Sequence, residues 1–227
     1  MAGLGPRVAR GISRRSPPGR ERGRMAIDDT ERAKTTAAAC VRASCRGCSL
    51  QGRVLCLHEP VDLMDFAVLW LTWMLPFLAG MILGRFWLAL AVWVALAAVF
   101  FIYVEALVLC RHCPHYAEPG RVLSCHANSG LPKIPRIRPG PMTLLEKVVW
   151  LGYVAVLVLY YVPFFVVSGQ WLLLGLTTWA GIAFTWTLQR TQCNRCYNLA
   201  CPVNRVPAAV RAEIERNFPG FAPHRGR

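Results

Sequence analysis

The sequence predicts an all-α membrane protein with four transmembrane helices, arranged as two repeated hairpins with cysteine-rich cytoplasmic loops. Apolar residues make up 55% of the chain and charged residues only 17%. The apolar residues are clustered into four runs, and each run is about 20 residues long, the length that a helix needs to cross a hydrocarbon core of about 30 Å. Short turns join the runs in pairs, which predicts antiparallel hairpins.

Residues 1–36 precede the first of these features and are rich in Arg, Gly, Pro and Ser. They have no apolar period, so we expect a disordered basic tail, with contact to anionic lipid as the functional alternative. Met25 is an alternative start of the chain. The net charge of +14 does not predict nucleic-acid binding, because the basic residues flank membrane segments, where orientation explains them.

The first hairpin is expected over residues 61–109 and the second over 148–190. Their spans run from about 63 to 83, 86 to 109, 148 to 167 and 171 to 188. Pro76 and Pro163 fall inside spans, where proline removes a backbone N–H, so each should kink its helix. Thr143 and Glu146 have the spacing of a capping box, which predicts a helix start there.

Three polar segments surround the hairpins: a cysteine-rich segment over 37–60, a Cys/His/Pro-rich loop over 110–147 and a cysteine-rich tail over 191–227. The tail contains a predicted short helix after Pro207. Its apolar residues Val210, Ile214 and Phe218 recur every four positions, which predicts one apolar face lying on the membrane surface or on the bundle.

The two hairpins share an order of features that predicts an internal repeat. Each has a Pro-Phe pair, a turn, a Trp and then a CxxC motif. Trp87 precedes Cys110 by 23 positions, and Trp171 precedes Cys193 by 22. Matching order and spacing favour duplication. The alternative is coincidence between two hairpins of similar composition.

Four spans return the chain to its starting side, so all ten cysteines should lie on one face of the membrane. The same face would carry every Lys and Arg except Arg85. Such an excess marks the cytoplasmic side, which predicts cytoplasmic termini in an inner (plasma) membrane protein. Cytosolic cysteines stay reduced, so their number favours metal binding or redox chemistry over disulfides.

The two CxxC motifs predict a shared metal site. A CxxC turn lets two thiolates face one ion, and two such turns complete a tetrahedron. We therefore expect Cys110, Cys113, Cys193 and Cys196 to bind one metal across the two hairpins. The alternative is four unrelated thiols near helix ends.

A second, weaker set precedes the first span. Its first three cysteines match the C-x4-C-x2-C opening of plant-type ferredoxins, but the fourth comes too early for that fold. A separate zinc or iron–sulfur site and a pooled site both remain open. The second set is Cys40, Cys45, Cys48 and Cys56, and the pooled site would add Cys125 and Cys201. Four histidines each lie within two residues of a cysteine and are candidate ligands: His58, His112, His115 and His126.

Thiolate and imidazole ligands suit zinc, iron–sulfur clusters or Cu(I), with zinc leading for a closed site of two CxxC turns. Glu105 is the only carboxylate well inside a span. A carboxylate at that depth is a candidate functional group. The alternative is that it reaches the headgroups or pairs with Arg111 or Arg190.

The cysteine motifs resemble those of a group of uncharacterised prokaryotic multi-pass membrane proteins. The resemblance covers about residues 40–207. It rests on the middle loop, with Cys110-Arg-His-Cys113-Pro-His-Tyr116, Cys125-His-Ala-Asn128 and Arg138-Pro-Gly-Pro141, and on the tail Cys193-Asn-Arg-Cys196-Tyr-Asn-Leu-Ala-Cys201-Pro-Val-Asn204-Arg-Val-Pro207. It implies a membrane location and no activity.

These observations favour a membrane protein whose cytoplasmic Cys/His face binds a metal, with a structural, metal-handling or partner-binding role toward an unknown protein. The alternative is an iron–sulfur or dithiol redox protein that exchanges electrons with a partner or a quinone. A membrane enzyme or transporter is a weaker third interpretation, since the sequence has no P-loop, GxSxG or HExxH motif.

Overall fold

The structure is a computed structural model that describes residues 37–221, so the predicted basic tail lies outside the described residues. Within this range the fold is helical, and its only strand-like feature is an isolated bridge between Val122 and Pro132. Four helical segments are long and apolar enough to cross a membrane, as the sequence predicts. They are Pro60–Leu83, Trp87–His112, Leu144–Val167 and Trp171–Cys193.

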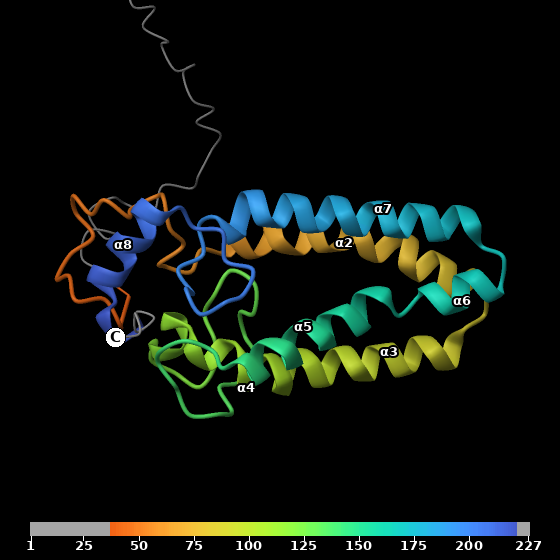
Figure 1. Ribbon diagram of the computed structural model, residues 1–227, viewed down its shortest axis with the longest axis horizontal. Helices are drawn as coiled ribbons and strands as arrows, with labels where there is room; N and C mark the ends of the chain where they lie inside the picture. Colours follow the sequence, from red (N-terminus) through yellow and green to blue (C-terminus); the bar gives the residue numbers. More distant parts are fainter. Residues whose placement is uncertain (1–36, 222–227) are drawn as a thin grey trace, which may run out of the picture.

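The first and fourth spans pack side by side along their length (Figure 1). The first is a single helix, α2 (Pro60–Leu83), and the fourth is α7 (Trp171–Leu188). The second span begins as α3 (Trp87–Val99) and passes through a π-helical turn, Phe100–Val104, into the short α4 (Glu105–Val108).

The third span is broken where proline predicts a break. Its first part, α5, covers Leu144–Leu159, and its second part, α6, covers Val162–Val167, with Pro163 in the first turn of α6. Proline has no N–H to donate and crowds the preceding turn, so the helix is interrupted just before it. By contrast, α2 continues through Pro76.

Both hairpin turns have the same backbone geometry. Each places one residue in the left-handed region, Arg85 (φ 57°) in the first and Gly169 (φ 70°) in the second. The next N–H then closes the helix end: Phe86 donates to the Met81 carbonyl, and Gln170 donates to the Phe165 carbonyl. Such bonds satisfy carbonyls that a helix end leaves without partners.

The interior of the bundle is aromatic near its middle. Phe77 is fully buried, stacks on Trp73 at 5.4 Å and contacts Trp93 at 4.8 Å between ring centroids. The outward side chains of the spans are mostly exposed and apolar, as expected for helices that face lipid.

All three polar segments gather at one end of the bundle (Figure 1). We call this assembly the cap: residues 37–59, 110–143 and 194–221. It has a core of its own, in which α8 (Ala208–Asn217) packs its apolar face on Tyr197, Leu50 and Val54. The predicted position of that face on the membrane surface or the bundle is therefore wrong, because the cysteine-rich segment supplies the apolar side chains that cover it.

Candidate functional site

A cavity of about 260 Å³ lies where the four spans meet the cap. Six of the ten cysteines line it, together with His115, His126 and Glu105. The structure thus brings the four cysteines of the two CxxC motifs to one cavity and adds two that sequence reasoning treated as secondary. We call this region the thiol end, defined by Cys110, Cys113, Cys125, Cys193, Cys196 and Cys201.

The first CxxC is held in a tight turn directly after α4. Cys110–His112 form one turn of 3-10 helix, and the N–H of Cys113 donates to the Cys110 carbonyl at 2.9 Å. The side chain of His112 lies away from the thiol end. Its Nδ1 is 3.0 Å from the Gly140 carbonyl, and its Nε2 is 3.3 Å from the Glu146 carboxylate. Both ring nitrogens therefore have polar partners, so His112 is not available to a metal. Its position beside Cys113 had made it a candidate ligand.

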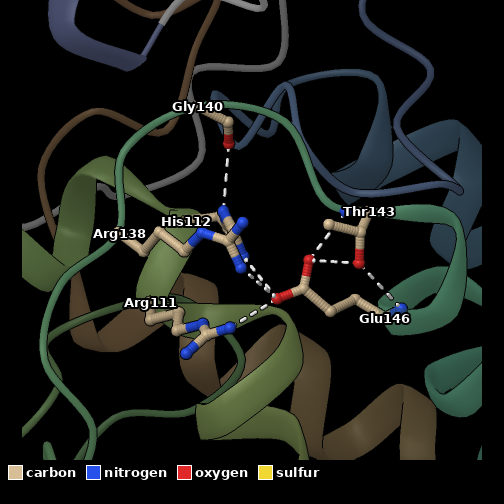
Figure 2. Close-up of polar contacts among 6 residues, drawn as sticks. All are labelled: Arg111, His112, Arg138, Gly140, Thr143 and Glu146. Atoms are coloured by element: carbon tan, nitrogen blue, oxygen red, sulfur yellow. Dashed lines mark hydrogen bonds and ion pairs between the residues drawn. The ribbon is translucent and has the colours of Figure 1, made fainter.

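Glu146 fixes this turn to the start of α5 (Figure 2). One oxygen, Oε1, accepts from Arg111 at 2.5 Å and Arg138 at 3.1 Å, as well as from His112. The other, Oε2, accepts from the N–H of Thr143 at 2.7 Å, and the Thr143 hydroxyl accepts from the Glu146 N–H at 3.3 Å. The predicted capping box is therefore confirmed, and its carboxylate also anchors the first CxxC.

The second CxxC begins at the last residue of a π-helical turn, Gln189–Cys193, which follows α7. The tail folds back on this turn: the N–H of Arg205 donates to the Cys193 carbonyl at 3.0 Å, and Asn204 donates to the Cys196 carbonyl at 2.7 Å. Asn204 also donates to the Asn198 carbonyl. The Cys-Pro-Val-Asn stretch of the tail thus packs Cys201 beside the second CxxC.

Four of the six thiols receive hydrogen bonds from the backbone two positions further along. The donors are His115 for Cys113, Ala127 for Cys125, Asn198 for Cys196 and Val203 for Cys201. Hydrogen bonds to sulfur favour the thiolate form and are one of the features that tune metal–thiolate centres.

Asn128 connects two of the thiols and was not among the site residues expected from the sequence. Its N–H donates to the Cys125 sulfur at 3.1 Å, and its side-chain amide donates to the Cys110 sulfur at 3.5 Å. Asn128 follows Cys125 by three residues in a loop rich in turn residues. Asn side chains often hydrogen-bond nearby groups in turns, so this position could have suggested a contact with the cysteine.

Burial is the main influence on these thiols. It raises the pKa of Cys113, Cys125 and Cys196 above the ordinary value, and it raises the pKa of Cys201 to about 12. Neighbouring thiols add to the effect: Cys196 and Cys125 raise the pKa of Cys113 further. The thiols therefore lie close enough to influence one another, and a bound cation would favour their thiolates.

The candidate histidines divide into two groups. His112 lies away from the thiol end. The rings of His115 and His126 line it, with 6.5 Å between their centroids. His115 is 3% exposed, hydrogen-bonds the backbone of Leu55 and leaves Nε2 without a hydrogen-bond partner. Because the Leu55 N–H already donates to Arg195, the group that His115 contacts is the carbonyl. Metal-bound histidines typically have one nitrogen held in this way.

His58 lies beside this pair, with its Nε2 3.3 Å from the Ser129 hydroxyl. Burial, with neighbouring His126 and His58, lowers the pKa of His115 to about 3. Burial and His58 also lower the pKa of His126 to about 4. Both rings are therefore neutral at physiological pH, which is the form that binds metals.

Glu105 is buried and lines the same cavity, beside Asn128 and Trp150. The alternative partners expected from the sequence are engaged elsewhere: Arg111 pairs with Glu146, and Arg190 lies over the Trp186 ring at 4.7 Å. The interpretation of Glu105 as one half of an ion pair with either arginine is therefore wrong.

The second set of cysteines lies in the cap, outside this cavity. Cys45, Cys48 and Cys56 line another cavity, of about 190 Å³, together with Arg195. Burial, with the thiols of Cys48, Cys40 and Cys45, raises the pKa of Cys56 to about 12, so Cys40 is also near. Tyr197 lies between the two sets of cysteines. Burial raises the pKa of its hydroxyl, and thiols from both sets, Cys113 and Cys56, raise this pKa further.

All ten cysteines are free thiols. Within residues 37–221, no three His, Cys, Asp or Glu side chains already surround one point as metal ligands would. Binding a metal at the thiol end would therefore require the cysteine side chains to rotate toward a common centre.

Comparison with protein-family models, curated proteins and solved structures finds no match for this chain. The resemblance to uncharacterised prokaryotic membrane proteins stays a prediction.

Proposed function

We propose that the thiol end binds a soft metal ion, with zinc as the leading candidate. The observation that carries the proposal is the convergence of six cysteines, from the ends of two spans and two loops, on one cavity. Zinc sites in proteins are built from four such ligands, which CxxC turns supply in pairs. Iron–sulfur clusters and Cu(I) use the same donor atoms.

We place Cys113 and Cys196 at the centre of the proposed site, because they come one from each CxxC motif, line the same cavity, and the thiol of Cys196 raises the pKa of Cys113. Cys125 and Cys201 have backbone donors to their sulfurs, which favours them as the other two ligands. Cys110 and Cys193 complete the two CxxC pairs and are the alternative. His115 is a further candidate through its free Nε2.

A metal held there would tie the end of the second span to the end of the fourth. It would fix the two proposed repeat hairpins relative to each other and give the cap a Cys/His-rich face for an unknown protein partner or for metal handling. We place the cap on the cytoplasmic side of an inner membrane, because every Lys and Arg within residues 37–221 except Arg85 lies in the cap or at a span end beside it.

Serine variants test the shared site. Cys113→Ser and Cys196→Ser should each lose the same metal equivalent, and the double variant should lose no more than either single variant, because one ligand lost from a closed site releases the ion. Metal content of the purified full-length protein is the measurement. Additive partial losses would instead show two independent sites and contradict the proposal.

Further serine variants identify the other ligands. Cys110→Ser and Cys193→Ser are compared with Cys125→Ser and Cys201→Ser, and the pair that loses metal supplies the remaining ligands. Cys48→Ser is the matched control, because this cysteine lies in the other cavity and should leave the metal at the thiol end in place.

An iron–sulfur redox role is the second candidate. It is favoured by the hydrogen bonds to sulfur and by the aromatic wall that continues from the thiol end into the bundle. Such a cluster would exchange electrons with a partner or a quinone. Iron with acid-labile sulfide and visible absorbance after anaerobic purification would support this role, whereas zinc without colour would exclude it at this site.

A further inference from the structure

The cavity extends from the thiol end into the membrane part of the bundle. Eight aromatic side chains, contributed by all four spans, line this region, which we call the aromatic half. Trp73, Trp93, Trp150 and Phe184 represent the four spans. We propose that the aromatic half binds a planar, lipid-soluble molecule with ring carbonyl oxygens, the chemistry of a quinone.

Two buried indole side chains line this region. Trp73 is 4% exposed and Trp150 is 8% exposed, and the indole Nε1 of neither has a partner at hydrogen-bond geometry. Trp73 lies against Gly181 of α7. Trp150 lies beside the Glu105 carboxylate, so an occupant's oxygen would share the Trp150 donor with Glu105. Trp93 provides the contrast, because its Nε1 donates to the Leu157 carbonyl at 3.0 Å. Buried indole N–H groups usually have an acceptor, so an occupant with acceptor oxygens fits this wall.

Two buried acceptors complete the polar set. Oε2 of Glu105 and Oε1 of Gln192 line the same cavity and also have no hydrogen-bond partner. They could accept from the hydroxyls of a reduced ring, as the indoles could donate to the carbonyls of an oxidised one. A lipid acyl chain has no group that could pair with any of these atoms, and leaving them unpaired is costly.

The size and shape of the cavity limit the occupant. Its volume of about 260 Å³ lies just below the range of about 300–1,000 Å³ that ligand sites usually have. A single ring would fill much of it and could stack on the indoles, while a long tail would have to lie in the surrounding lipid. The inference uses the cavity of the proposed function, but it does not depend on a metal being bound there.

Binding of decyl-ubiquinone to the full-length protein in nanodiscs tests the proposal. Calorimetric titration, with empty nanodiscs subtracted, should show saturable binding. Trp150→Phe keeps the ring and removes the donor, so Kd should rise about fivefold, as expected for one lost hydrogen bond. The double variant Trp73→Phe, Trp150→Phe should bind more weakly still.

Trp179→Phe is the matched control, because this indole is 71% exposed and lies outside the cavity. It should bind as the unmodified protein does. Absence of saturable binding, or equal Kd values for Trp150→Phe and Trp179→Phe, would overturn the proposal. Metal content and metal uptake of the same samples separate the two ideas: quinone binding by protein that holds no metal and takes up neither zinc nor iron when these are supplied supports this inference while contradicting the proposed function.

Discussion

His112 Nε2 lies 3.3 Å from Glu146 Oε1, so one of the two residues between the cysteines of the first CxxC is fixed to the first turn of α5. The contact spans two segments that the sequence separates by 34 positions. The same carboxylate accepts from two arginines and completes the helix cap (Figure 2). The geometry of the thiol end therefore depends on a group that contacts none of its sulfurs.

Glu146→Gln should destabilise the protein, because it removes the negative charge from a buried group beside Arg111 and His112. We expect a loss of about 2–4 kcal/mol in the free energy of unfolding. Denaturant unfolding in detergent is the measurement. Glu213→Gln is the control: this carboxylate pairs with Arg216 on the surface, where its loss should have little effect. Equal effects of the two substitutions would contradict the structural role of Glu146.

Gly80→Ala should destabilise the bundle. A Cβ at this position would overlap the ring of Phe165, which is fully buried and cannot move aside freely. Overpacking of this kind costs about 1–3 kcal/mol. Gly175→Ala is the matched control, since its Cβ would meet no atom within 4 Å. Addition of Phe165→Leu should recover part of the loss; no difference between the two alanine variants would show that α2 and α6 are not packed as described.

Asn128→Ala should weaken the metal site without unfolding the cap, because it removes the amide that donates to Cys110 and keeps the backbone donor to Cys125. Groups that support metal ligands typically change affinity about 10- to 100-fold. Competition with a chelator measures this change. Ser129→Ala is a suitable comparison, since that hydroxyl contacts His58 and no sulfur. Unchanged affinity in Asn128→Ala would exclude Asn128 from the site.

Tyr197 should tolerate loss of its hydroxyl but not of its ring. The ring is 1% exposed and contacts His115 at 4.6 Å and Phe218 at 5.1 Å, whereas its hydroxyl has no hydrogen-bond partner. Tyr197→Phe should therefore be neutral or stabilising, and a larger truncation, Tyr197→Ala, should cost about 3–5 kcal/mol. Protease resistance of the cap reports both variants. A strong loss in Tyr197→Phe would reveal a partner for the hydroxyl.

The spans could be predicted because their apolar runs have the length of a membrane. The apolar run alone placed the start of the third span near 148, whereas the helix begins at Leu144, as the capping box predicts. The break at Pro163 follows from proline chemistry alone, yet α2 continues through Pro76. Local sequence does not decide how the neighbouring turns accommodate a proline.

The membership of the thiol end was predictable only in part. Spacing suggested the two CxxC motifs, but Cys125 and Cys201 reach the cavity through loop contacts, such as those of Asn128 and Asn204, that no local pattern reveals. His112 and His115 are near neighbours in sequence and differ in role, because the 3-10 turn directs the first toward Glu146. The aromatic half combines residues from all four spans, so it follows from the tertiary fold and not from any single helix.

The most direct test of the metal proposal is elemental analysis, together with a visible spectrum, of full-length protein extracted and purified without oxygen. The account predicts a near-stoichiometric soft metal that Cys113→Ser and Cys196→Ser both lose. Zinc without colour would support the leading candidate, and iron with sulfide would support the redox alternative. Protein that is folded but carries no metal, and takes up neither zinc nor iron when these are supplied, would contradict the proposal that the thiol end is a metal site.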